Sequence, residues 1–165
     1  MEPFIPEEPS DELERLADEQ LSDADSESTD RRERGRNRRG RVLDLYNRAL
    51  IQTGDDHYHA ALIMLYGEDV AHYELSKTFA RRATALGSSR AWSIIAAAWD
   101  RSLIQRGKPQ RFGTQFIREA GHWTLGRVDT AMSDAERAMY GVPPLWVQEQ
   151  AVERLRQRED DTEAQ

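Results

Sequence analysis

Apolar residues recur at helical spacing along most of the chain after residue 40. The segment RVLDLYNRALIQTG carries its apolar residues on one helical face and is expected to end at Gly54. Two similar segments follow, DDHYHAALIMLYG and EDVAHYELSKTFARRATALG, which are expected to end at Gly67 and Gly87. These spacings predict three amphipathic helices joined by short turns.

The next segment, AWSIIAAAWDRSLIQRG, is apolar around most of its circumference in its first half. It predicts a buried fourth helix that Ser88 or Ser89 caps and that Gly107 and Pro109 end. We expect four large apolar side chains to be buried against one another at the centre of the core. These are Phe79, Trp92, Ile95 and Trp99.

Beyond the fourth helix the pattern changes. RFGTQFI and HWTLGRV have aromatic and β-branched residues and are separated by Glu119–Gly121, which predicts a two-stranded hairpin. Ser133–Glu136 is a capping box, and it predicts a short helix to Tyr140. Pro144 suits the first turn of a last helix, which is expected from Leu145 to about Arg158.

The predicted fold class is therefore mainly α, a compact helical bundle with one small β-hairpin. The short helices joined by tight turns resemble tetratricopeptide or Sel1-type helical pairs. Only about one and a half such repeats are present, and a free-standing solenoid needs roughly three. We therefore expect one helical domain over residues 42–158, followed by a disordered tail over residues 159–165.

Charge is distributed unevenly along the chain, whose net charge is −7. Residues 1–30 hold twelve acids and one arginine, whereas residues 31–42 hold seven arginines and one glutamate. Few large apolar groups occur in residues 1–30, so we expect a disordered acidic arm with at most a short helix around Asp11 to Leu21, and its deletion should leave folding intact. Residues 31–41 are expected to be a solvated linker and helix start.

The arginine-rich segment RRERGRNRRGR is the one candidate for nucleic-acid binding. Arginine-rich segments can fold on RNA, but the acidic arm would compete for the same charges and no aromatic residue is interleaved for base stacking. Specific nucleic-acid binding is therefore not predicted. The arginines could instead reach back to the domain.

Composition limits the remaining classes of function. The chain has no cysteine, which excludes disulfides and thiolate chemistry. No apolar run is long enough to span a membrane and the N-terminus is acidic, so we expect a cytoplasmic protein with no membrane segment or secretory signal. His57 and His59 lie on different sides of a helix, and no metal site or cofactor is predicted.

The candidate site lies where the fourth helix ends. Asp and Arg are rarely buried unless paired, so Asp100 and Arg101 are expected to face each other, to cap the following loop, or to line a cleft. The loop then supplies a cluster of hydrogen-bond donors and acceptors. The candidate ligand-binding residues are Arg101, Gln110, Arg111, Thr114 and Gln115.

This loop also carries a resemblance to a known family. The order Asp100-Arg101, Gly107-Lys108-Pro109-Gln110 and Phe112-Gly113-Thr114-Gln115 resembles a bacterial domain-of-unknown-function family with a Gly-x-x-Gln-x-aromatic-Gly-Thr-Gln hallmark. The resemblance extends over roughly residues 30–145 and includes Tyr58-His59-Ala60-Ala61 and Glu136-Arg137. Many relatives carry a Gln-His pair where this chain has Leu65-Tyr66. The resemblance implies a shared fold and a shared polar site, but no established activity.

Two classes of function remain open. In the first, the protein is a small binding or accessory module that recognises a polar ligand or a protein partner through the Gln110–Gln115 loop. In the second, it is an enzyme in which His59 is the acid or base and Asp100 orients it, while Arg101, Gln110 and Gln115 hold a polar or anionic substrate. The first is favoured because no complete catalytic set can be identified.

Overall fold

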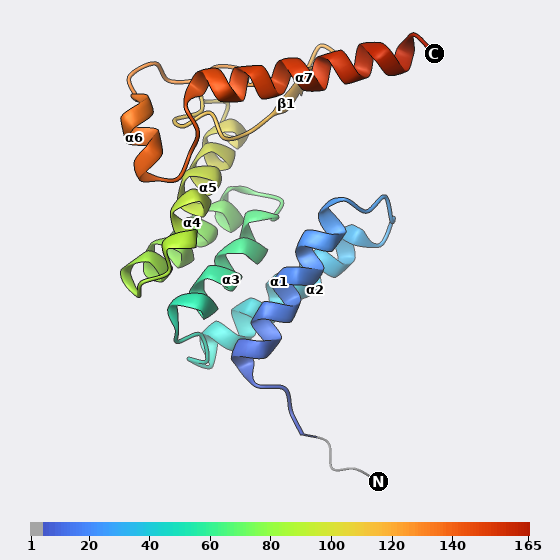
Figure 1. Cartoon of the computed structure of the whole chain (residues 1–165). Coiled ribbons are helices and arrows are strands. Elements are labelled where there is room, and N and C mark those ends of the chain that lie inside the picture. Colours follow the sequence, from blue (N-terminus) through green and yellow to red (C-terminus); the bar gives the residue numbers. More distant parts are fainter. Residues whose placement is uncertain (1–4) are drawn as a thin grey trace.

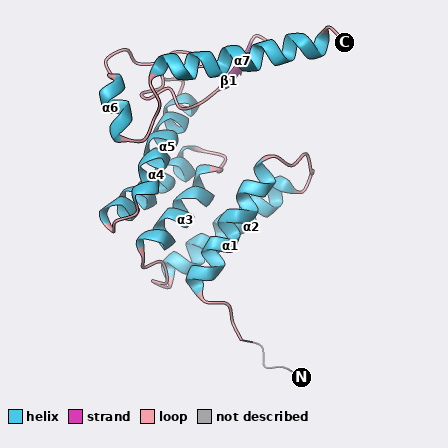
Figure 2. Cartoon of the chain, in the orientation of Figure 1, coloured by secondary structure: helices cyan, strands magenta, loops and turns pink. Residues whose placement is uncertain are grey.

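The computed structural model describes residues 5–165, and this part of the chain contains seven α-helices and one antiparallel hairpin (Figures 1 and 2). The predicted mainly α fold with one small β-hairpin is confirmed. The helices are α1 (Pro9–Ala24), α2 (Arg31–Asn47), α3 (Gly54–Leu65), α4 (Val70–Ala85), α5 (Trp92–Gln105), α6 (Asp134–Met139) and α7 (Leu145–Glu163). A short 3-10 turn, η1 (Ser89–Ala91), precedes α5.

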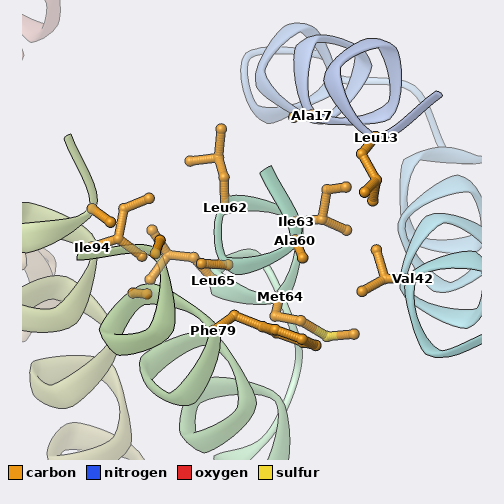
Figure 3. Close-up of a cluster of buried hydrophobic side chains, with 14 of the residues drawn as sticks. Leu13, Ala17, Val42, Ala60, Leu62, Ile63, Met64, Leu65, Phe79 and Ile94 are labelled. Atoms are coloured by element: carbon orange, nitrogen blue, oxygen red, sulfur yellow. The ribbon is translucent and has the colours of Figure 1, made fainter. Parts of the chain in front are cut away.

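Helix α3 is the centre of the main core because it packs against α1, α2, α4 and α5. Its sequence GDDHYHAALIML is apolar in its second half, so it can bury side chains on several sides. Figure 3 shows Leu13 of α1 and Val42 of α2 pointing toward the same side of α3. Phe79 of α4 and Ile94 of α5 close the cluster from the other side.

The expectation that residues 1–30 form a disordered arm is wrong for the helical part of that segment. Helix α1 packs on α3 and buries Leu13, Leu16 and Ala17, which lie at helical spacing on one face. Most of its acidic residues are solvated, whereas Glu12 and Asp23 face α2. A narrow apolar stripe is therefore sufficient to hold the helix once α3 supplies the surface that it covers.

The expectation of a solvated arginine-rich linker over residues 31–41 is also wrong. Those residues form most of α2, in which Arg38 and Arg39 are buried. The carboxylate of Asp23 lies 2.7 Å from Arg34 and 2.5 Å from Arg38, and Glu12 binds Arg41 at 2.7 Å. The acidic and basic segments thus neutralise each other as an antiparallel helical pair. Helix α2 ends at Asn47 instead of near Gly54, because Ala49 adopts a left-handed conformation with φ of 58° and the Leu50 amide donates back to the Leu45 carbonyl.

The predicted core around the fourth helix is partly wrong. Trp92 is 42% exposed, and its ring packs edge-on against Tyr140, 5.5 Å away between centroids. Phe79 and Ile95 are buried as expected, and the ring of Phe79 lies edge-on to that of Tyr46. Ser88 precedes η1 without making a side-chain cap, so the predicted capping of the fourth helix is wrong as well.

The hairpin and the last helix lie beyond α5 (Figure 1). Strand β1 (Ile117–Glu119) pairs with β2 (His122–Thr124), with Arg118 opposite Trp123. Helix α7 packs against β2 and continues to Glu163, so the predicted disordered tail is helical over most of its length. Within the described chain, no helix is long and apolar enough to cross a membrane.

Candidate functional site

Three consecutive residues in the second half of α5 contact three different parts of the molecule. Trp99 packs against the loop residue Phe112, Asp100 binds the backbone of the same loop, and Arg101 reaches back to the end of α3. Successive side chains on a helix are about 100° apart, so adjacent residues can contact different parts of the protein. Asp100 and Arg101 therefore do not form the ion pair that was one of the expected arrangements.

The Asp100 carboxylate is fully buried and organises the loop. One oxygen accepts the backbone amides of Arg111 and Phe112, at 2.7 Å and 3.0 Å. The other accepts the backbone amide and the hydroxyl of Thr114, at 2.9 Å and 2.7 Å. Four donors thus satisfy this buried charge without any cationic side chain. Of the three arrangements expected for Asp100, the structure has the one in which it caps the loop.

Gln110 is also a structural part of the loop, with only 1% of its surface exposed. Its side-chain amide donates to the carbonyls of Gln115 and Leu125, and its side-chain oxygen accepts the amide of Gln115. Its backbone bonds the segment around Val128 in a parallel bridge. Every polar group of the Gln110 side chain is therefore occupied inside the protein, so it is not free to hold a ligand.

Arg101 has no ion pair with a carboxylate among the described residues. Its guanidinium donates to the Leu65 carbonyl and, at 2.9 Å, to the side-chain oxygen of Gln115, and it stacks over the ring of Tyr66. Burial lowers the pKa of Arg101. A cation at the last carbonyls of α3 is favourable because those carbonyls carry the negative end of the helix dipole. Arg101 and Gln115 thus connect the loop to α3.

Two further residues, Arg137 and Gly113, fix the loop. Arg137 of α6 is buried and donates to the Phe112 carbonyl at 2.9 Å. Gly113 adopts a left-handed conformation, with φ of 78°, and an added Cβ would lie 3.0 Å from a methyl group of Leu145. Only glycine fits that position easily. The loop is therefore a rigid unit held from three sides.

His59 does not join this site. It lies on α3 beside Tyr58, with ring centroids 5.3 Å apart, and its Nδ1 atom is buried without a hydrogen-bond partner. The pKa of His59 is lowered, because the effect of burial is larger than the opposing effect of the nearby Glu14 carboxylate. Asp100 makes its hydrogen bonds to the loop and makes none to His59, so the predicted arrangement in which Asp100 orients His59 is wrong.

The outward side of the loop carries Arg111, which is exposed and lies against Trp99. The guanidinium of Arg111 and the ammonium of Lys77 each lie 4.9 Å from the Trp99 ring centroid, and Arg81 lies at 5.5 Å. We call these four residues the Trp99 cation cluster. Lys77 pairs with Glu74 at 2.9 Å. Within residues 5–165, Arg81 and Arg111 have no ion pair.

Arg111 was predicted from the sequence as a binding residue, but Lys77, Arg81 and Trp99 were not. Lys77 and Arg81 are four residues apart, so one face of α4 presents both cations. That spacing could have indicated a basic face. Nothing in the sequence indicated that this face would meet Trp99, because the contact depends on how α4 and α5 pack.

The described residues include no group of three or more histidine, aspartate or glutamate side chains placed to hold a metal ion. Comparisons with models of protein families, with curated proteins and with solved structures find no match. The candidate site therefore consists of a buried scaffold, made by Asp100, Gln110, Thr114 and Gln115, and an exposed cationic surface around Trp99.

Proposed function

We propose that this protein is a binding module that recognises an acidic segment of a partner protein through the Trp99 cation cluster. The observation that carries the proposal is that Arg81 and Arg111 lie against a partly exposed tryptophan and form no ion pair among the described residues. Carboxylates of a partner would supply the missing counter-charges. Tryptophan and arginine are also the residue types most enriched among the energetically dominant contacts of protein interfaces.

The buried loop supports this function by holding Arg111 in place. The Asp100 carboxylate accepts the backbone amide of Arg111 itself at 2.7 Å, and the ring of Phe112 packs edge-on against Trp99, with centroids 5.8 Å apart. A side chain whose backbone is already fixed loses less conformational entropy on binding. Asp100, to which the sequence assigned a catalytic role, thus acts by positioning Arg111.

The alternative function, an enzyme based on His59, has less support. Its proposed acid or base and its proposed substrate-binding residues lie in separate surroundings, and Gln110 is occupied within the loop. A binding module needs only the exposed cluster and a rigid support for it.

The test measures the binding of a fluorescently labelled peptide rich in glutamate and aspartate by fluorescence anisotropy at low ionic strength. Arg81→Gln and Arg111→Gln should each weaken binding about threefold to fivefold, as expected for the loss of one exposed charge contact. Arg82→Gln is the matched control, because Arg82 is exposed on the same helix but does not contact Trp99. Equal losses in all three variants, or no saturable binding, would contradict the proposal.

A further inference from the structure

A polar cleft lies between α1, α2 and the end of α3, and Tyr66, over which Arg101 stacks, is part of its lining. Its volume is about 410 Å³. The residues that matter for its chemistry are Gln20, Arg31, Arg32, Gly35, Arg39 and Glu68. This volume is within the range of small-ligand sites, and the cleft is built from the segment that the sequence marks as unusually rich in arginine.

Arg39 is the buried residue of this cleft, with 4% of its surface exposed. Its Nε atom is buried and has no hydrogen-bond partner. Its other contacts are long, 3.4 Å to the Tyr66 carbonyl and 3.5 Å to the Glu68 carboxylate. Burial lowers the pKa of Arg39. The guanidinium has five N–H donors, and within the protein it is only partly satisfied.

Glu68 is the carboxylate that lines the cleft. Arg32 and Arg36 both bind it, Arg36 at 3.2 Å, and Arg39 lies at the longer distance given above. Nearby Asp69 accepts the backbone amide of His72 at the start of α4, and its charge also acts on Arg39 from outside the lining. Glu68 thus faces the three guanidinium groups of Arg32, Arg36 and Arg39. Arg31 also lines the cleft, so the lining holds three arginines and one carboxylate. The positive charge of the cleft exceeds what Glu68 can balance.

Gly35 keeps space beside Arg39. A Cβ atom at this position would lie 3.2 Å from Nη1 of Arg39 and 3.8 Å from the side-chain oxygen of Gln20. Glycine in the middle of a helix is unfavourable compared with alanine, so a residue that weakens α2 stands where a methyl group would press on the buried guanidinium. Gln20 is itself buried, and its oxygen accepts from Arg38 at 3.1 Å.

We propose that this cleft binds a small free oxyanion, inorganic phosphate or diphosphate, and that Glu68 occupies part of the site as an internal counter-ion. A phosphate group carries more negative charge than a carboxylate and offers more acceptor oxygens to planar guanidinium forks. It would supply acceptors for Arg32 and Arg39 that Glu68 provides only in part. The proposal concerns a different surface from the Trp99 cation cluster and does not depend on it.

The test is isothermal titration calorimetry of the full chain with inorganic phosphate and, separately, with pyrophosphate. We expect saturable binding at one site. Glu68→Gln should tighten binding about tenfold because it removes the competing carboxylate. Arg32→Gln should weaken binding at least fivefold without loss of folding, since 72% of the Arg32 side chain is exposed. Gly35→Ala should also weaken binding, by crowding Arg39.

The matched control is Arg48→Gln, because Arg48 lies just beyond the same helix, is 59% exposed and pairs with Asp44 outside the cleft. Its affinity should equal that of the unaltered protein. If Glu68→Gln does not fold, Arg32→Gln and Gly35→Ala decide the question. No saturable heat with either anion, or an Arg48→Gln loss as large as that of Arg32→Gln, would overturn the proposal.

Discussion

Asp100 and Thr114 are joined twice, because one oxygen of the Asp100 carboxylate accepts both the backbone amide and the hydroxyl of Thr114. Asp100→Ala would leave these donors, and the amides of Arg111 and Phe112, without acceptors in a buried setting. We expect a loss of about 3 to 5 kcal/mol in the free energy of unfolding, measured by urea denaturation. Asp55→Ala, at a side chain that is 70% exposed, should change it by no more than about 0.5 kcal/mol.

Gln115→Ala should be more costly than its sequence position suggests. As a residue on an exposed loop it would be expected to change stability by at most about 0.5 kcal/mol, but its side-chain oxygen accepts from Arg101 at 2.9 Å. Removing that acceptor leaves a buried guanidinium N–H unpaired, so we expect a loss of about 1 to 3 kcal/mol. Gln150→Ala on the exposed face of α7 provides the comparison. Equal stability of the two variants would show that Arg101 does not depend on Gln115.

Deletion of residues 1–29 should destabilise the protein, contrary to the expectation from sequence. The deletion removes α1 and exposes the side of α3 that it covers. Leu13→Ala isolates the effect, because Leu13 is fully buried and its truncation should cost about 2 to 5 kcal/mol. Leu21→Ala on the same helix is the control, since Leu21 is 43% exposed. Unchanged thermal unfolding of Leu13→Ala would mean that α1 is not part of the cooperative unit.

The helices after residue 40 and the hairpin could be predicted because their signals are local. Apolar spacing, the Ser133 capping box and the glycine in the hairpin turn each act within a few residues. A short helix around Asp11 to Leu21 was allowed, but the packing of α1 on α3 was not predicted, because the composition of residues 1–30 is that of a disordered segment. The apolar stripe of α1 is narrow, and only the surface of α3 makes that stripe sufficient.

The candidate site could be predicted only in part, for a similar reason. The loop was identified as a cluster of polar side chains, but composition does not reveal whether such side chains face inward or outward. Asp100 and Gln110 face inward and bind the backbone, whereas Arg111 faces outward. The meeting of Lys77 and Arg81 with Trp99 depends on the packing of α4 against α5. Such contacts between separate helices leave no pattern in one sequence.

The ion pairs that arginines of α2 form with Asp23 of α1 and with Glu68 make stability depend on pH. Hydrogen bonds from Arg34 and Arg38 hold the pKa of Asp23 well below its usual range, and those from Arg32 and Arg36 lower the pKa of Glu68. In the unfolded chain these carboxyl groups titrate near pH 4, about their ordinary values. Between the folded and unfolded pKa values, the unfolded state binds more protons than the folded state. Stability is therefore fully present above about pH 5 and falls as the pH is lowered through that window.

Thermal unfolding followed by circular dichroism between pH 7 and pH 2 should show this fall, and Asp23→Asn should reduce it. At pH 7 the unaltered protein should be the more stable of the two, because the variant lacks the charge that binds Arg34 and Arg38. Below about pH 5 the unfolded chain takes up a proton on Asp23 while the folded chain keeps Asp23 charged in its ion pairs, so these pairs stabilise the unaltered protein less as the pH falls and the difference in melting temperature should narrow. Asp25→Asn is the control, since Asp25 makes no ion pair among the described residues. A difference between Asp23→Asn and the unaltered protein that stays constant across this range would show that the Asp23 ion pairs do not contribute to stability.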